Sequence, residues 1–459
     1  KEMLEGFSNK GMITVALLFL VSEGIRQSGT LGQVIKKLLP QGKTTVFKAQ
    51  LRILPSVAFI SAFLNNTPVV VIFAPIIKHW AKSVKLPATK FLIPLSYVTI
   101  LGGICTLIGT STNLVVHGMI LEAGYEGFTM FELGKVGIFI AIAGIIYLFI
   151  FSKRLLPDAR PDTAVPDEEV EEGEKLHRVE AVLGARFPGI NKKLSDFNFQ
   201  RHYGAEVKEI KTRNGQRYVD HLEDVVLREG DTLVVMADDT FIPTWGESSV
   251  FVLLTNGNDP DTSGKKKRWL ALILLVLMIV GATVGELPAT KEMFPDIKLD
   301  MFFFVCITTI IMAWTNIFPA RKYTKYISWD ILITIACAFA ISKAMVNSGV
   351  ADCVAGFIIG LSDDYGPHVL LAILFVITNL FTELITNNAA AALAFPLALS
   401  ISAQLGVSPT PFFVVICMAA SASFSTPIGY QTNLIVQGIG NYKFTDFVRI
   451  GLPLNIITF

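Results

Sequence analysis

The sequence predicts a polytopic α-helical membrane protein made of two inverted repeats with re-entrant hairpins and broken helices, plus a small cytoplasmic α/β domain inserted between them. Three observations lead to this prediction. Of the 459 residues, 52% are hydrophobic and 17% are charged, and the mean hydropathy is +0.54, which is too apolar for an ordinary soluble protein. Roughly half of the charged residues lie in one central segment, residues 153–268. The apolar blocks on either side share sequence motifs.

The charge and cysteine content exclude several functional classes. The net charge is +1 and the one basic run, residues 265–268, is short, so nothing favours a nucleic-acid partner. All five cysteines lie in apolar stretches without the spacing of metal ligands, which indicates buried thiols rather than disulfides or a metal site. No expected span ends in a cluster of His, Cys or acidic residues, so we do not expect an enzyme.

The apolar stretches approach the length of about 20 residues that a membrane helix needs. They group into a first membrane repeat over residues 1–152 and a second over residues 269–459, separated by the charged segment 153–268. Because the chain begins in a polar stretch and ends inside an apolar one, we expect the first repeat to lack N-terminal helices and the last helix to be truncated. The expected spans are residues 11–25, 91–121, 134–151, 269–284, 301–318, 329–346, 411–437 and a final one from residue 447.

Two further apolar stretches are interrupted in the middle by polar residues. Residues 53–80 contain Asn65-Asn66-Thr67-Pro68, and residues 369–399 contain Thr386-Asn387-Asn388. A continuous membrane helix would expose paired asparagines to hydrocarbon, whereas a re-entrant hairpin places them at a tip inside the protein. We therefore expect a hairpin in each half.

The distribution of Lys and Arg sets the expected orientation, because short cytoplasmic loops collect positive charge. Lys48 and Arg52 precede the first hairpin and Lys78 and Lys82 follow it, so both of its ends should lie in the cytoplasm. The same rule places residues 153–268 in the cytoplasm and makes the second hairpin enter from outside. We expect an integral protein of the plasma (inner) membrane.

The two apolar blocks match each other at an offset of about 320 positions. Residues 109–118 and 429–438 share the pattern G-x-x-T-N-L-x-V-x-G, and Asn65-Asn66 matches Asn387-Asn388 at an offset of 322. Because the two hairpins enter from opposite sides, the repeats should be inverted. Inverted repeats with broken helices are typical of secondary transporters, which hold the substrate where the repeats meet.

Four polar breaks are therefore the candidate binding elements: the two tips and the two motif copies that begin at Gly109 and near Ser425. Freed backbone carbonyls suit Na⁺, and the helix N-termini that follow each break suit an anion. The alternative is four kinks packed by Ser, Thr and Asn hydrogen bonds. Glu383 is the one acid near a tip, and it is expected to be a cation ligand or proton carrier, with a hydrated or structural carboxylate as the alternative.

With these motifs, the chain resembles the divalent-anion:sodium symporter (DASS) family, whose members are homodimers that work by an elevator-type movement. In that family two Ser-Asn-Thr tips and two unwound loops form the sodium and anion sites. The resemblance implies sodium contacts at Ser61, Asn65, Asn66, Gly109, Glu383, Thr386, Asn388 and Gly429. It implies anion contacts at Asn66, Thr67, Thr110, Ser111, Asn387, Asn388, Ala389, Tyr430 and Gln431. This chain departs from the family pattern by Asn in place of both serines and by Ala389 in place of a threonine.

The central segment carries a second resemblance. After an acidic linker at residues 158–174, residues 178–239 alternate apolar and polar positions around Gly-Asp turns, which favours a small α/β domain. The pattern L-x-x-GD-x-L-V-V, here Leu227 to Val235, resembles the TrkA C-terminal (RCK-C) domain. That resemblance implies a sensor of a small ligand such as a regulatory nucleotide, or else a dimerisation or folding module.

The expected function is Na⁺-coupled symport of a small divalent anion across the lipid bilayer, by a homodimer that binds no nucleic acid. The family resemblance favours sulfate, with a C4-dicarboxylate as the alternative substrate. A less favoured alternative is an RCK-regulated ion channel, because the sequence carries no T-V-G-Y-G filter. The sequence leaves H⁺ coupling open as an alternative to Na⁺.

Overall fold

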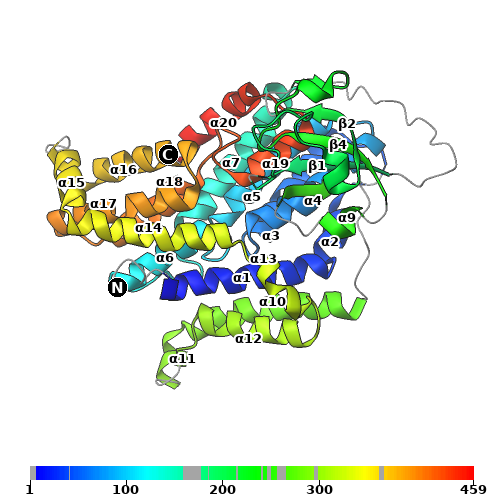
Figure 1. Cartoon of the computed structure of the whole chain (residues 1–459). Coiled ribbons are helices and arrows are strands. Elements are labelled where there is room, and N and C mark those ends of the chain that lie inside the picture. Colours follow the sequence, from blue (N-terminus) through cyan, green and yellow to red (C-terminus); the bar gives the residue numbers. More distant parts are fainter. Residues whose placement is uncertain are drawn as a thin grey trace.

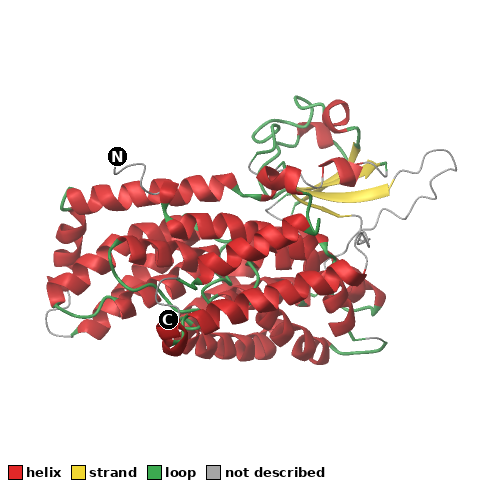
Figure 2. Ribbon diagram, turned by 90° about the horizontal axis from the view of Figure 1, so that it is seen from below, coloured by secondary structure: helices red, strands yellow, loops and turns green. Residues whose placement is uncertain are grey.

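The computed structural model shows a body of long helices with a small β-sheet at one end (Figures 1 and 2). It describes residues 7–40, 42–158, 177–184, 186–212, 216–238, 241–245, 250–255, 265–293, 298–360 and 366–459. The expected acidic linker lies outside these residues, apart from Asp158. Four of the described helices are long and apolar enough to cross a membrane, and a bent pair would make five. This is the fold of a polytopic membrane protein.

The described residues of the first apolar block form seven α-helices. The expected hairpin is formed by α3 and α4, which are separated by residues 62–65. The expected span 91–121 is broken, as the polar motif at Gly109 predicted, into α5 and α6, with an unwound loop over residues 104–110 between them. The bounds are α1 (Lys10–Gln27), α2 (Thr30–Leu38), α3 (Val46–Ser61), α4 (Asn66–Ser83), α5 (Leu92–Gly103), α6 (Ser111–Glu122) and α7 (Gly134–Leu155).

The central segment forms a five-stranded antiparallel sheet in the order β3-β2-β4-β1-β5. Alternate residues of β1, such as Val179 and Ala181, are buried under an aromatic layer that includes Phe187 and Tyr203. Gly230, at φ +83°, makes the turn into β4. The bounds are β1 (His177–Leu183), α8 (Phe199–Tyr203), β2 (Glu206–Lys211), β3 (Arg217–Tyr218), β4 (Thr232–Ala237), α9 (Phe241–Trp245) and β5 (Phe251–Thr255).

The second apolar block repeats the order of the first after two additional long helices. The second expected hairpin is formed by α16 and α17, and the expected span 411–437 is broken into α18 and α19. The bounds are α10 (Lys265–Gly285), α11 (Pro288–Met293), α12 (Met301–Trp314), α13 (Tyr323–Tyr326), α14 (Trp329–Asn347), α15 (Val350–Gly360), α16 (Pro367–Leu384), α17 (Asn387–Leu405), α18 (Thr410–Ser421), α19 (Gln431–Gly440) and α20 (Phe444–Thr458).

Corresponding helices of the two blocks make corresponding contacts. Helix α3 packs on α5 as α16 packs on α18, and α4 packs on α19 as α17 packs on α6. The last two pairs cross between the blocks, so the second arm of each hairpin lies against the broken helix of the other block. Figure 1 shows α19 beside α4 and α5. The packing therefore brings all four breaks into one region.

Helices α3 and α5 cross at a point where only glycine fits. A Cβ atom added to Gly102 would overlap the carbonyl oxygen of Ala58. We predict that Gly102→Ala lowers the thermal stability of the detergent-purified protein, by about 1–3 kcal/mol, because the neighbouring atom is backbone and cannot rotate away. Gly356→Ala is the matched control, since only the Gln404 side chain, at 3.8 Å, comes near its Cβ position. Equal melting temperatures for both variants would contradict the prediction.

Candidate functional site

The first hairpin tip is organised around the Asn66 side chain, which is buried where α4 begins. Its amide makes the most hydrogen bonds with the nitrogen facing three oxygens: Ser61 Oγ at 2.8 Å, Thr99 O at 3.0 Å and Gly109 O at 3.2 Å. The amide oxygen then accepts a hydrogen bond from the Tyr430 hydroxyl at 2.5 Å. Ser61 Oγ also donates to Thr99 O at 2.9 Å. Asn66 thus joins its own hairpin to α5, to the first loop and to the second block.

The second tip repeats this arrangement around Asn387, the first residue of α17. Thr382 Oγ1 lies 2.8 Å from Asn387 Oδ1 and 2.6 Å from Ala420 O, and it can donate its single proton to either oxygen. The residues Ser61, Asn66 and Thr99 of the first tip therefore correspond to Thr382, Asn387 and Ala420 at a constant offset of 321. In both tips a hydroxyl five residues before the asparagine contacts a backbone carbonyl of the helix that follows the hairpin: Ser61 contacts α5, and Thr382 contacts α18.

This correspondence corrects the expected alignment of the tips by one residue. The comparison of the sequences paired Asn66 with Asn388, but the hydrogen bonds pair Asn66 with Asn387. Thr67 therefore corresponds to Asn388, and neither Glu383 nor Ala389 has the place in the tip that the offset of 322 gave it. The error arises because two adjacent asparagines fit either register in sequence, and only one of them reaches the hydroxyl.

Two asparagines within the repeated motif hold the unwound loops, a role that the sequence analysis missed. Asn113 Nδ2 donates to Thr106 O at 2.9 Å and to Gly103 O at 3.4 Å. Asn433 Nδ2 donates to Thr426 O at 3.1 Å and to Ser423 O at 2.9 Å, again at an offset of 320. Each amide satisfies carbonyls that the break leaves without helical partners. The repeated T-N-L pattern was the signal that marked them.

Each tip also contacts the loop or helix start of the opposite block. Thr67 Oγ1 lies 3.3 Å from Gln431 Oε1, and Asn388 Oδ1 accepts from Thr112 Oγ1 at 3.2 Å and from Ser111 Oγ at 3.4 Å. The Tyr430 hydroxyl lies 3.1 Å from Thr110 Oγ1. The structure therefore brings together most of the expected anion contacts, in one cluster of hydroxyl and amide groups: Asn66, Thr67, Thr110, Ser111, Asn387, Asn388, Tyr430 and Gln431.

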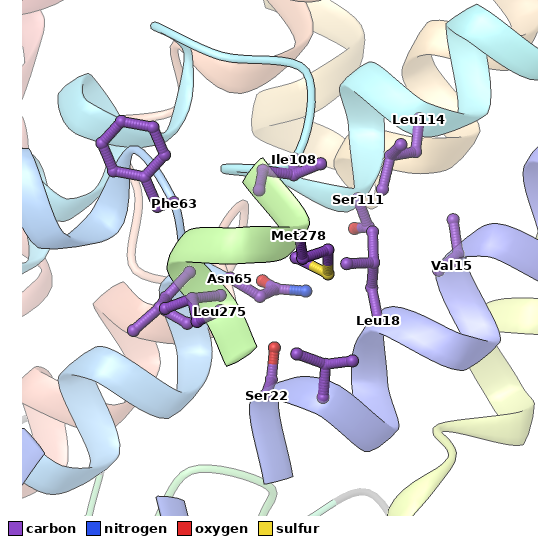
Figure 3. A pocket seen from close by; sticks show the side chains of 12 residues that line it. Val15, Leu18, Ser22, Phe63, Asn65, Ile108, Ser111, Leu114, Leu275 and Met278 are labelled. Atoms are coloured by element: carbon purple, nitrogen blue, oxygen red, sulfur yellow. The ribbon is translucent and has the colours of Figure 1, made fainter. Parts of the chain in front are cut away.

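Among the described residues, three expected site residues make no side-chain hydrogen bond to this cluster. Asn65 faces a narrow pocket between α1, α6 and α10, where Figure 3 shows it beside Leu18, Ser111 and Met278. Thr386 is exposed, and its side chain does not cap α17. Ala389 offers only a methyl group. Gly109 and Gly429 do fit the site, because a Cβ at either would overlap the neighbouring loop atoms of Gly103 or Ser423.

Glu383 contacts the second loop rather than a tip. Its Oε1 accepts from the backbone N–H of Ser425 at 2.9 Å and from Asn455 Nδ2 at 2.8 Å. Its buried Oε2 makes no hydrogen bond with the part of the chain that the structure describes. Asn455, on α20, also donates to Ser425 Oγ at 2.9 Å. The carboxylate is thus oriented by two donors and keeps one oxygen for a further ligand.

The site carries little charge apart from Glu383. The stretches that form it, residues 53–77, 91–121, 369–405 and 411–437, contain no Lys or Arg. Four helices begin within it, at Asn66, Ser111, Asn387 and Gln431, and their first N–H groups carry partial positive charge. The chemistry on offer is therefore anion binding by helix N-termini, hydroxyls and amides, with carbonyl and amide oxygens for a cation.

The α/β domain is docked on two of these helices. Lys78 Nζ of α4 lies 2.9 and 3.0 Å from the carboxylate oxygens of Glu180 on β1, and Lys211 Nζ lies 3.3 Å from Oε1. On α19, Gly438 lies against Thr232, and Leu434 packs against Gly230. The domain thus contacts the helices that begin at Asn66 and at Gln431.

The sequence pattern of the citrate transporter family (CitMHS) matches residues 1–406 and 294–459, which together span the whole chain. The chain belongs to the citrate transporter family. This membership identifies a membrane transport protein rather than an enzyme. It confirms the expectation of a DASS-like permease as far as the transporter family is concerned.

Several curated relatives of this family member are similar over its whole length. An uncharacterized transporter of Synechocystis sp. is 29% identical over 99% of this chain and 88% of that protein. A putative sulfur deprivation response regulator of Chlamydomonas reinhardtii is 28% identical over 100% of this chain and 92% of that protein. A probable sodium/sulfate cotransporter 3 of the same alga is 32% identical over 61% of this chain and 31% of that protein.

The ion pair between Glu180 and Lys78 should stabilise the docked domain. Burial by itself would raise the pKa of Glu180, but Lys78 and Lys211 outweigh it and lower the pKa from 4.5 to about 2. A lowered pKa contributes stability that is present above about pH 4.5 and is lost as the pH falls toward 2. We predict that Lys78→Gln destabilises the protein by about 1–3 kcal/mol at pH 7, because Lys211 compensates only in part.

Thermal unfolding of the detergent-purified protein checks this prediction. Lys82→Gln, at an exposed position of the same helix, is the matched control and should melt like the wild type. The difference between the two variants should stay constant from pH 6 to pH 8, since Glu180 remains ionised throughout. A Lys78→Gln variant as stable as the control would show that the pair does not hold the domain.

Proposed function

We propose that this protein is a Na⁺-coupled symporter of a small divalent anion, with sulfate as the substrate and a C4-dicarboxylate as the alternative. The observation that carries the proposal is the meeting of two asparagine tips with the two unwound loops of the opposite blocks. The name of the relative described as a probable sodium/sulfate cotransporter supports the same two ions, Na⁺ and sulfate. A channel is less favoured, because the sequence carries no T-V-G-Y-G filter.

The first tip offers a set of oxygens suited to Na⁺. Ser61 Oγ and the carbonyls of Thr99 and Gly109 already surround one end of the Asn66 amide, and a half-turn of that amide would add Oδ1 to them. The second tip offers Thr382, Asn387 and the carbonyl of Ala420 in the same way. Unwound carbonyls and amide oxygens of this kind coordinate Na⁺ in other transporters with broken helices.

The anion would lie between the tips, where four helix N-termini converge. With no Lys or Arg in these stretches, its charge would be balanced by N–H groups, hydroxyls, amides and the bound cations. A site without a fixed positive charge binds an anion weakly unless the cations are present. This dependence is the physical basis of coupling between sodium and the anion.

The larger architecture follows from the same reasoning. The matched hydrogen bonds and packing support two repeats, and the distribution of Lys and Arg supports their inversion and a cytoplasmic α/β domain. We infer a homodimer with elevator-type movement from the family resemblance alone. The domain is proposed to regulate transport, in the manner of an RCK-C sensor for a small ligand such as a nucleotide, through its contacts with α4 and α19.

The central asparagines provide the first test in proteoliposomes. We predict that Asn66→Ala and Asn387→Ala each reduce Na⁺-driven sulfate uptake more than tenfold (about 1.4 kcal/mol or more) without unfolding the protein, because each removes a ligand that no neighbour replaces. Uptake of labelled sulfate and of a C4-dicarboxylate, with and without a Na⁺ gradient, measures this. Counterflow of labelled anion distinguishes a carrier from a channel. Near-normal uptake by both folded variants would refute the site.

Glu383 allows a separate test of the cation. If its free carboxylate oxygen lowers the energy of a bound Na⁺, Glu383→Gln should raise the Na⁺ concentration for half-maximal uptake at least several-fold, since a charge a few Å away contributes several kcal/mol at an effective dielectric of about 20. A proton carrier would instead lose the pH dependence and keep the Na⁺ response. Glu122→Gln, at the far end of α6, is the control. If uptake by Glu383→Gln responds to Na⁺ and to pH as the wild type does, the role of Glu383 is structural.

A further inference from the structure

The Tyr430 hydroxyl is the direct link between the first tip and the second loop. It lies 2.5 Å from the Asn66 amide oxygen and 3.1 Å from Thr110 Oγ1, and the Asn387 side chain lies within hydrogen-bonding reach of it. At an offset of 320, Tyr430 corresponds to Thr110. One loop therefore extends a phenol into the centre of the cluster, where the other extends only a short hydroxyl. The two halves therefore differ at the position that lies between the first tip and the second loop.

The hydrogen bonds of Asn66 determine where the phenol proton goes. With the Asn66 nitrogen facing Ser61, Thr99 and Gly109, its amide oxygen takes the proton of Tyr430. A phenol has a single proton to donate, so the phenol oxygen then offers only lone pairs to the rest of the cluster. Lone pairs directed at an anion repel it.

The opposite orientation of the amide reverses this arrangement. A cation among the Ser61, Thr99 and Gly109 oxygens repels an N–H group and attracts Asn66 Oδ1. The Asn66 nitrogen then faces Tyr430 and donates to the phenol oxygen at the same position, 2.5 Å away. The phenol proton is released from Asn66 and is free to be donated to an anion. Hydrogen bonds to a charged acceptor are about twice as strong as neutral ones.

We propose that Tyr430 couples cation binding to anion binding, because the acceptor of its hydroxyl proton depends on the orientation of the Asn66 amide. When a cation holds Asn66 Oδ1, the hydroxyl donates to the anion. When no cation is bound, it donates to Asn66. The proposal rests on the Na⁺-coupled function proposed above. It assigns to Tyr430 a role that differs from a plain binding contact. A plain contact would change the anion affinity equally with and without sodium.

Tyr430→Phe tests this role, because it removes the hydroxyl and keeps the ring. The Na⁺ affinity of the purified protein is measured by thermal shift, with and without saturating sulfate. By linkage, the factor by which sulfate tightens Na⁺ binding equals the factor by which Na⁺ tightens sulfate binding. We expect sulfate to tighten Na⁺ binding by a factor of roughly 10–100 in the wild type and of about 2 or less in Tyr430→Phe. Na⁺ binding in the absence of sulfate should be retained in the variant.

Two further variants make the result specific. Tyr442→Phe removes another buried phenol hydroxyl, which contacts Thr89 and Ile93 away from the tips, and should keep the wild-type factor. Thr110→Val removes another partner of the Tyr430 hydroxyl; it should weaken sulfate binding while keeping the factor by which sulfate tightens Na⁺ binding. This second variant also tests the proposal if Tyr430→Phe fails to fold.

Several results would overturn the proposal. A wild-type factor in Tyr430→Phe would show that the hydroxyl does not couple the ions, and so would loss of the factor in Thr110→Val. An equal loss of sulfate affinity with and without Na⁺ would make Tyr430 a plain contact. If the wild type binds neither sulfate nor a C4-dicarboxylate in a Na⁺-dependent way, the proposed function itself fails, and this inference fails with it.

Discussion

The structure depends on how the backbone is satisfied where helices break inside an apolar body. A break frees N–H and C=O groups that cannot turn to water, and each unsatisfied group is expensive. Here three asparagine side chains, those of Asn66, Asn113 and Asn433, supply hydrogen bonds to freed backbone carbonyls. Asn387 is held instead by the Thr382 hydroxyl. The same amides that permit the breaks are the groups that can recognise ions. Stability and binding therefore use the same residues.

Each tip also packs against the broken helix of the opposite block, α4 on α19 and α17 on α6. Side chains join them: Thr67 lies near Gln431, and Asn388 accepts from Ser111 and Thr112. Glycines at Gly103 and Gly109 allow the backbone of the loop to approach Asn66 closely. The α/β domain then docks on α4 and α19 through Lys78 and Leu434. A movement of α4 or α19 must therefore change the surface on which the domain sits.

Much of the fold could be predicted from residue patterns because the breaks are local. Asn65-Asn66-Thr67 and Thr386-Asn387-Asn388 interrupt apolar stretches, and a polar pair within hydrocarbon is unfavourable in any arrangement. The helix breaks and the membership of a transporter family agree with these predictions. Hydropathy alone makes residues 91–121 one apolar stretch, and it was the polar motif beginning at Gly109 that predicted the break between α5 and α6.

The sequence by itself determined the class of the protein, the positions of the breaks and the residue types available to bind ions, since these depend on local composition and repeated motifs. Only the tertiary structure decided which asparagine of the second tip is central, that Glu383 lies behind the second loop with Asn455, and that Tyr430 reaches Asn66. These facts depend on contacts between residues some 70 to 360 positions apart, or on a register that adjacent identical residues leave open. Side-chain hydrogen bonds of fixed length and direction settle such choices, and the linear sequence does not encode them.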